Sequence, residues 1–144
     1  HHNVNFTAEM ITRTLGTLNG GKGTFTEGIN TVHSMMKKVI ATEFDMMDGS
    51  GWTTYTQISA EQLASLLAAQ TEKPTFQVFY DSLAAIDGTH LVGIQEHRED
   101  MRSISGYIQT QTGDLLAYSL LLNGYSPTPS KQFIENFVEK LAVQ

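Results

Sequence analysis

Two short stretches of the sequence place a serine where it could act as a nucleophile. Ser34 and Lys37 have the SxxK spacing, which puts an amine one helical turn from a hydroxyl so that the amine can accept the hydroxyl proton. Residues 48–51 read DGSG and set Ser50 between two glycines. Both serines are therefore candidates for acyl-transfer chemistry.

Each serine also has a simpler structural interpretation. Ser34 lies within residues 25–39, whose apolar residues repeat at helical spacing, so an ordinary amphipathic helix would carry it on its flank. Ser50 follows Asp48, whose side chain can hydrogen-bond forward to its own turn. The hydrolase pattern GxSxG is not met, because Asp48 stands where the first glycine belongs. The residues alone favour a turn at DGSG.

The elements that must position these residues are mostly helices, followed by a β-hairpin and a last helix. Helical segments are expected over about 5–18 and 25–39, after Ser59, after Pro74 and from about Thr128, with capping boxes at Thr24–Glu27 and Ser59–Gln62. Strands are expected at 43–47, 102–110 and 115–123. Both faces of the strand at 115–123 are apolar, which predicts a layer above and below it.

The composition indicates one acidic domain. With 144 residues the chain can build one core, so residues 1–144 are expected to form a single domain. The net charge of −6 argues against nucleic acid as a partner, and no apolar run approaches the roughly 20 residues of a membrane span. The absence of cysteine excludes disulfides and thiol catalysis. Neither a metal site nor a cofactor is expected.

Four longer stretches follow one another as in a known enzyme family. They read NVNFTAEMITRTLG, GGKGTFTEGINTV, MMDGSGWTTYTQISAEQLASLL and RSISGYIQTQTGDLLAYSLLLNGY. Over about residues 3–125 they resemble the C-terminal portion of the D-alanyl-D-alanine carboxypeptidases of the penicillin-binding-protein-4 type, peptidase family S13. Typical members show SDNLYAEML, DGSGLS, KTGTL and LSGY. The chain is similar to a truncated, motif-degenerate form of such an enzyme.

The resemblance implies a fold, a location and partners. The fold would be α/β with α+β layers, a partial serine β-lactamase or penicillin-binding-protein-like domain in which about five helices flank an antiparallel hairpin sheet. The location would be extracytoplasmic, in the cell envelope, and the ligand a peptidoglycan peptide. The family's first strands lie upstream, so the strand at 115–123 would expose an apolar edge. That edge is expected to pair with a second copy or with an upstream segment.

The resemblance also implies an active site in which SxxK supplies the nucleophile and SxN assists it. The family SxxK lies far upstream of SxN, so Ser34 and Lys37 are not at the matching place. Asn5 matches the asparagine of SxN, while Asn3 stands at its serine position and has no hydroxyl to relay a proton. The turn from Asp48 through Gly49 and Ser50 to Gly51 matches DGSG, a structural turn near the family's cleft.

The third implied element is the KTG strand, which holds the terminal carboxylate of the substrate. Counting back from Ser105 of SGY, its positions fall on Ile94, Gln95 and Glu96. Alternatively, that strand is deleted and residues 88–89 are a partial relic. Either alignment leaves no lysine, and Glu96 is an anion where a cation is needed.

Three functions remain open from the sequence. The chain is expected to be a noncatalytic relative of a serine D-alanyl-D-alanine carboxypeptidase in peptidoglycan metabolism. It could instead be a cell-envelope binding or scaffold module for a peptidoglycan peptide or a protein. A third alternative is an active serine hydrolase that uses Ser34 and Lys37 or is completed by a partner chain.

Overall fold

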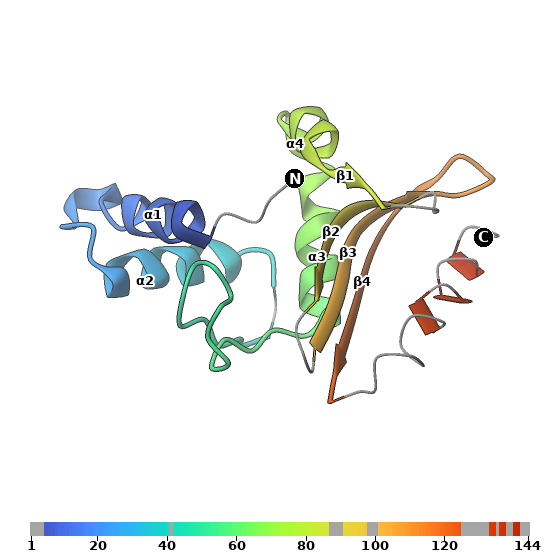
Figure 1. Cartoon of the computed structure of the whole chain (residues 1–144). Helices are drawn as coiled ribbons and strands as arrows, with labels where there is room; N and C mark the ends of the chain where they lie inside the picture. The colour runs from blue at the N-terminus through green and yellow to red at the C-terminus, as the bar shows by residue number, and fades with distance from the viewer. Residues whose placement is uncertain are drawn as a thin grey trace. The chain divides into compact units, whose positions relative to one another are not determined.

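The computed structural model divides into two compact units, residues 1–62 (the first unit) and 63–144 (the second unit). It describes residues 5–40, 42–86, 91–97, 101–124, 133, 134, 136, 137, 140 and 141. Each unit has its own packed elements, shown in Figure 1. A single domain over residues 1–144 stays a prediction.

The first unit is built on a pair of adjacent helices, α1 (Asn5–Leu15) and α2 (Phe25–Met36), joined through the 3-10 helix η1 (Leu18–Gly20) (Figure 1). The two helices approach closely because Gly28 has no side chain. A Cβ at Gly28 would lie 2.3 Å from the carbonyl oxygen of Thr12. Helix α1 ends about three residues earlier than expected, and the 3-10 helix η1 follows it on the way to α2.

The predicted capping box at the start of α2 is confirmed. The backbone N–H of Glu27 donates to Thr24 Oγ1 (3.3 Å), and the backbone N–H of Thr24 donates to Glu27 Oε2 (2.9 Å). These bonds hold the pKa of Glu27 below its usual value, with the Thr24 backbone N–H as the main cause. The box fixes where the second helix begins.

The strand predicted at residues 43–47 is wrong. Only Asp45 has a strand-like partner there, in an isolated antiparallel bridge to Gln57. The N–H of Asp45 donates to the Gln57 carbonyl (3.0 Å) and the N–H of Gln57 to the Asp45 carbonyl (2.7 Å). Beyond this bridge the N–H of Met47 donates to the side-chain oxygen Thr56 Oγ1 (3.1 Å), so the backbone ladder does not continue. The bridge closes a loop that contains the DGSG turn.

The helix α3 (Ala60–Gln70) starts at the second predicted capping box. The backbone N–H of Ser59 donates to Gln62 Oε1 (2.8 Å), and that of Gln62 donates to Ser59 Oγ (3.1 Å). The second unit then continues with α4 (Phe76–Ser82), which follows Pro74 as predicted. In the part of the chain described here, no helix has the length and apolar character needed to cross a membrane.

The sheet of the second unit has four antiparallel strands in the order β1-β2-β3-β4. Their bounds are β1 Ala84–Ala85, β2 Leu91–His97, β3 Met101–Gln109 and β4 Leu115–Asn123. The predicted hairpin corresponds to β3 and β4, with Gly113 at φ 91° in its turn. Residues 133, 134, 136, 137, 140 and 141 are helical, as expected of the last helix, whose predicted start at Thr128 lies outside the described residues.

Apolar layers cover both faces of this sheet. On one face, the buried residues Leu91, Ile104, Ile108 and Tyr118 pack with Ile134, Phe137 and Leu141 of the last helical segment. On the other face, the fully buried Tyr107 meets the rings of Phe76, Phe79 and Tyr80 from α4. The predicted α/β class, with helices layered on an antiparallel sheet, is confirmed.

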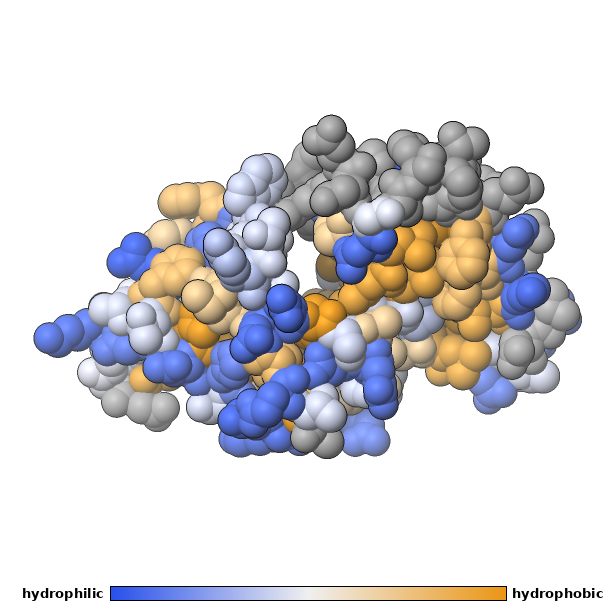
Figure 2. Space-filling view, turned by 90° about the horizontal axis from the view of Figure 1, so that it is seen from below, coloured by the Kyte–Doolittle hydropathy of each residue, from blue (hydrophilic) through white to orange (hydrophobic). Residues whose placement is uncertain are grey.

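The strand β4 is an outer strand of the described sheet, pairing with β3. It contains no charged residue and no proline, two features that commonly protect sheet edges. Figure 2 shows hydrophobic surface in its right-hand part, where the second unit lies. The expected pairing of residues 115–123 with another copy or an upstream segment stays a prediction.

Candidate functional site

The centre of the candidate site is the Asp48 carboxylate. Its Oδ2 accepts from the backbone N–H of Thr53 (2.8 Å) and lies 3.2 Å from Ser50 Oγ, while Oδ1 accepts from Thr56 Oγ1 (2.8 Å). The side chain is 9% exposed. One buried carboxylate therefore holds the loop from the DGSG turn to Thr56 in a single conformation.

The hydrogen bonds to Asp48 change its acidity. Burial raises the pKa of the carboxyl, but the bonds from the Thr53 backbone, Thr56, Ser50 and the Trp52 backbone outweigh burial, so the pKa lies below the ordinary 3.8. The carboxylate is ionised at neutral pH. It can thus serve as a permanent acceptor for the loop.

A second carboxylate fastens the turn to α1. Glu9 Oε1 accepts from the backbone N–H of Ser50 (3.0 Å) and from Ser50 Oγ (2.6 Å), and Oε2 accepts from the backbone N–H of Gly49 (3.2 Å). Gly49 lies against the helix, where a Cβ would come 2.1 Å from Thr12 Oγ1. The first glycine of DGSG is therefore required by close packing on α1.

These contacts give Ser50 a structural role. Its hydroxyl hydrogen is directed at Glu9, and its oxygen accepts from the backbone N–H of Trp52 (3.4 Å). Two carboxylates surround the hydroxyl, so the negative charge that develops during acyl transfer would be repelled. The interpretation of DGSG as a turn fits this geometry.

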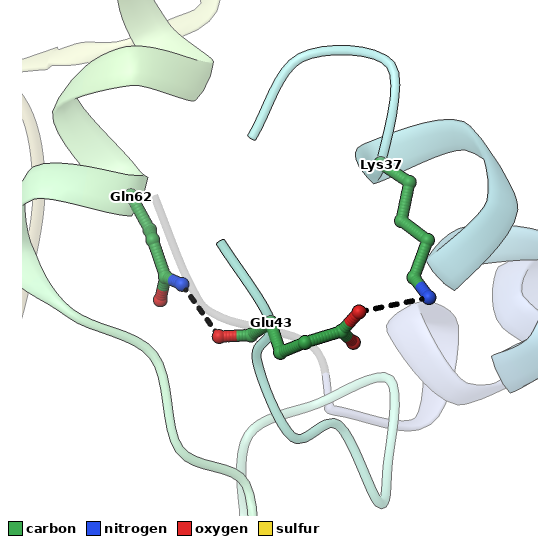
Figure 3. A network of polar contacts seen from close by, with 3 residues as sticks. All are labelled: Lys37, Glu43 and Gln62. Carbon is green, nitrogen blue, oxygen red and sulfur yellow. Dashed lines mark hydrogen bonds and ion pairs between the residues drawn. The ribbon is translucent and has the colours of Figure 1, made fainter. Parts of the chain in front are cut away.

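The structure does not bring Ser34 and Lys37 together as a catalytic pair. Ser34 Oγ donates to the carbonyl oxygen of Asn30 in its own helix (2.8 Å). Lys37 Nζ lies 3.2 Å from Glu43 Oε1, and Figure 3 shows the lysine side chain extended toward that carboxylate. The amide of Gln62 donates to the Glu43 carbonyl (2.9 Å) from the other side (Figure 3). Both SxxK residues therefore have structural partners.

Of the two residues that match SxN, the structure describes Asn5 and not Asn3. Asn5 is the first residue of α1 and is partly exposed, and Glu9 follows it one turn later on the same side of the helix. Asn3 lies outside the described residues. The helix that presents Asn5 is thus the one that anchors the DGSG turn.

The three residues at the KTG positions lie on β2. Ile94, Gln95 and Glu96 pair with Ser105, Ile104 and Ser103 of β3 in the antiparallel register. Ile94 is 52% exposed, and Gln95 is also exposed. A strand therefore exists beside the SGY strand, and residues 88–89 of the deletion alternative lie outside the described residues.

The SGY motif has a packing role. A Cβ at Gly106 would lie 2.0 Å from the Val92 carbonyl oxygen, so only glycine fits against β2. Ser105 Oγ and Ser119 Oγ are 2.9 Å apart, and Tyr107 donates its hydroxyl to the Leu67 carbonyl in α3 (2.7 Å). The motif thus joins β2, β4 and α3 to the central strand.

Glu9 is the residue of this site that sequence reasoning missed. Its contacts join residues 40 and 41 positions apart, which no local spacing reveals. One signal was present, because Glu9 coincides with the glutamate of the family stretch SDNLYAEML. No group of three or more histidine, aspartate or glutamate side chains suited to a metal ion occurs within the described ranges.

Replacing Glu9 with alanine is expected to lower the free energy of unfolding by about 2 kcal/mol, because the N–H groups of Gly49 and Ser50 lose their acceptor. Chemical denaturation followed by circular dichroism would measure the change. The exposed Glu72 provides the control, since Glu72→Ala should stay within about 0.5 kcal/mol of wild type. Equal effects of the two substitutions would contradict the role assigned to Glu9.

Replacing Asp48 with asparagine is expected to destabilise the chain at neutral pH and progressively less in acid. The pKa of Asp48 is lower in the folded than in the unfolded chain, so the ionised carboxylate favours folding. Its contribution is complete above the ordinary 3.8 and is lost as the pH falls through the folded pKa. Denaturation at about pH 7 and about pH 3 measures this; a difference that stays constant with pH would contradict it.

Comparison with known proteins places this geometry in a family. The model of the D-Ala-D-Ala carboxypeptidase 3 (S13) family matches residues 2–144. A search of curated proteins gave no match. The chain is thus assigned through its family model, and the solved structures test its fold.

Two structures of penicillin binding protein 4 from Haemophilus influenzae are similar to this chain, one of them complexed with a novel β-lactam. They have TM-scores of 0.83 and 0.86 at 16% and 17% identity, and the matches cover 98% and 97% of this chain. A predatory endopeptidase from Bdellovibrio bacteriovorus is similar over 98% of this chain, with a TM-score of 0.67 and 16% identity.

The matches cover 39%, 37% and 42% of those three proteins, so this chain spans about two fifths of their length. At these identities the structures establish the fold. The match of the family model to nearly every residue confirms the predicted resemblance to the C-terminal portion of a penicillin-binding-protein-4-type enzyme. The chain belongs to the D-Ala-D-Ala carboxypeptidase 3 (S13) family.

Proposed function

We propose that this chain is a noncatalytic member of the S13 family that does not carry out acyl transfer by itself. The observation that carries the proposal is the set of hydrogen-bond partners of the two candidate nucleophiles, Ser34 and Ser50. Ser34 donates to a backbone carbonyl while Lys37 is paired with Glu43, and Ser50 is held between two carboxylates. Among the described residues, neither serine hydroxyl is hydrogen-bonded to an amine that could accept its proton.

The substrate-holding residues support the same proposal. The KTG positions carry Ile94, Gln95 and Glu96, so this strand offers an apolar side chain and an anion in place of a cation. None of these three side chains is a cation that could bind a terminal carboxylate. Asn3 has no hydroxyl to take part in proton transfer. These residue types oppose hydrolysis of a D-Ala-D-Ala peptide by this chain alone.

A binding role is the second function that the geometry supports. The turn is fastened to α1 by Glu9 and to its own loop by Asp48, so the first unit keeps a rigid surface around Asn5 and DGSG without reactive chemistry. Preorganised surfaces bind with a lower ordering cost. The chain would then be an extracytoplasmic module for a peptidoglycan peptide or a protein partner.

A peptide that ends in D-Ala-D-Ala separates these functions in one experiment. We expect no release of D-alanine, measured by chromatography after prolonged incubation. Saturable chemical-shift changes in the protein without release would establish the binding module. Steady release above that of a heat-denatured sample would overturn the proposal.

Two variants identify the source of any release. If Ser34→Ala abolished turnover while Ser50→Ala left it intact, the hydrolase that uses Ser34 and Lys37 would be established. If release appeared only after the family's upstream segment was added as a separate chain, the site would be completed by a partner. Both results would replace the noncatalytic assignment.

A further inference from the structure

A groove in the first unit is lined by one side of α2 and contains no residue of the DGSG turn. Its volume is about 450 Å³, within the roughly 300–1,000 Å³ of small-molecule sites. The 3-10 helix η1 contributes one lining residue, and α2 with the turn after it contributes the others. The lining residues are Leu18, Asn30, Thr31, Ser34, Met35 and Lys38. The groove therefore combines apolar, neutral polar and charged side chains.

The charge of the groove comes from Lys38. Its backbone N–H donates to the Met35 carbonyl (3.3 Å), so Lys38 lies in a turn that continues α2. Within the part of the chain that the structure describes, neither the Lys38 ammonium nor the Asn30 amide has a hydrogen-bond or ion-pair partner. The adjacent Lys37, in contrast, is paired with Glu43. None of the described lining residues is acidic, so the groove favours an anionic ligand.

The two hydroxyl groups of the groove can act only as acceptors toward a ligand. Ser34 Oγ donates its hydrogen to the Asn30 carbonyl (2.8 Å), and Thr31 Oγ1 donates to the Glu27 carbonyl (2.8 Å). A hydroxyl has a single hydrogen and two lone pairs, so each oxygen keeps a lone pair for a further donor. A ligand that satisfies these oxygens must bring an N–H or O–H group.

Two apolar side chains give the groove a third kind of contact. Leu18 and Met35 are each 51% exposed and line the same groove from different elements. A ligand with an apolar group would remove part of both surfaces from water, which favours binding. The flexible side chain of Met35 can adapt to the shape of that group. The matching ligand is therefore apolar, anionic and a hydrogen-bond donor.

We propose that this groove binds a small apolar carboxylate that carries a hydrogen-bond donor beside the carboxylate, as in an N-acylated amino acid. The carboxylate pairs with Lys38 and accepts from the Asn30 amide. The N–H donates to Ser34 Oγ, and the apolar side chain covers Leu18 and Met35. Because Ser34 acts here as an acceptor, the proposal does not depend on whether the chain is catalytic.

N-acetyl-leucine is the probe, titrated into the isotope-labelled chain and followed by nuclear magnetic resonance. Amide signals of the groove are expected to shift and to saturate with a roughly millimolar dissociation constant, as suits a small ligand in an open groove. Lys38→Ala should weaken binding about fivefold, because the ion pair is lost. Lys37→Ala is the matched control, since it removes the same charge from a neighbouring lysine that does not line the groove, and should change the constant less than about twofold.

Two related probes test the carboxylate and the donor on the unaltered chain. N-acetyl-leucinamide has no negative charge, and isocaproate has no N–H, so each should bind about fivefold more weakly than N-acetyl-leucine. Ser34→Ala should weaken N-acetyl-leucine about threefold and leave isocaproate unchanged, because only N-acetyl-leucine donates to the serine oxygen. The amide spectrum of each variant shows that it is folded.

Three results would overturn the proposal. The first is the absence of saturable shifts up to about 20 mM N-acetyl-leucine. The second is equal weakening by Lys38→Ala and Lys37→Ala, which would assign the effect to overall charge. The third is binding of N-acetyl-leucinamide or inorganic phosphate as tightly as N-acetyl-leucine, which would remove the carboxylate or the apolar group from the assignment. Acyl transfer is measured separately, so either proposal can fail alone.

Discussion

Replacing Gly106 with alanine is expected to lower the free energy of unfolding by about 3 kcal/mol, because the new methyl group has no room between two strands. Its Cβ would lie 2.0 Å from the Val92 carbonyl oxygen and 2.6 Å from the Gly93 Cα. Both neighbours are backbone atoms of β2, and they cannot move away without disturbing the β2–β3 pairing. Denaturation monitored by circular dichroism measures the loss.

Gly113→Ala is the matched control for this substitution. Gly113 lies in the hairpin turn with φ 91° and has open space around its Cβ position. Alanine there costs only the backbone strain of about 1 kcal/mol. If Gly106→Ala were no more destabilising than Gly113→Ala, the close approach of β2 and β3 would not determine the glycine of the SGY motif.

Replacing Tyr107 with alanine is expected to cost about 4 kcal/mol, because the residue is the largest fully buried side chain of the second unit. Its ring meets Phe76 edge-on at 5.3 Å, and its hydroxyl donates to the Leu67 carbonyl. Burial raises the pKa of this hydroxyl, so it remains protonated and can donate. The same denaturation measurement applies.

Tyr107→Phe separates the ring from the hydroxyl. It keeps the aromatic packing and removes only the hydrogen bond to Leu67, so the expected loss is about 1 kcal/mol. Equal losses from the phenylalanine and alanine variants would mean that the hydrogen bond, and not the packed ring, supplies most of the stabilisation. Native-like circular dichroism of the phenylalanine variant would show that the fold is retained.

Local sequence patterns correctly predicted the helix starts that are fixed by residues a few positions away in the sequence. The capping boxes at Thr24 and Ser59 located two helix starts, because the bonds of a box join residues three positions apart. The apolar faces of 115–123 predicted layers above and below that strand. Layers lie on both sides of the sheet at β3, while in β4 Tyr118 is buried and Leu115 and Leu116 are exposed. These features are encoded within a few residues of where they occur.

Features that depend on distant contacts were not predicted from local patterns. The strand expected at 43–47 reduces to a single bridge at Asp45, because the N–H of Met47 donates to the hydroxyl of Thr56 and not to a backbone carbonyl. The function of Glu9 depends on Gly49 and Ser50, which lie 40 and 41 residues away. Periodicity cannot reveal such pairs, and only the fold brings them together.

The resemblance to the S13 family identified motifs that the periodicity of apolar residues could not reveal. It marked DGSG and SGY as motifs, and the structure now supplies a physical reason for each. Gly49 fits against α1, Ser50 binds Glu9, and Gly106 allows β2 to approach β3. The family assignment is shown by the match over residues 2–144. The loss of catalysis remains a proposal that depends on the partners of Ser34, Lys37 and Ser50.

The intact mass of the folded chain before and after incubation with excess benzylpenicillin tests that proposal most directly. The S13 resemblance implies that an active member would form a stable ester between its nucleophilic serine and the opened β-lactam. We expect an unchanged mass, with circular dichroism showing that the sample is folded. A stoichiometric gain equal to one benzylpenicillin, mapped to a serine by peptide analysis, would contradict the account and identify the working nucleophile.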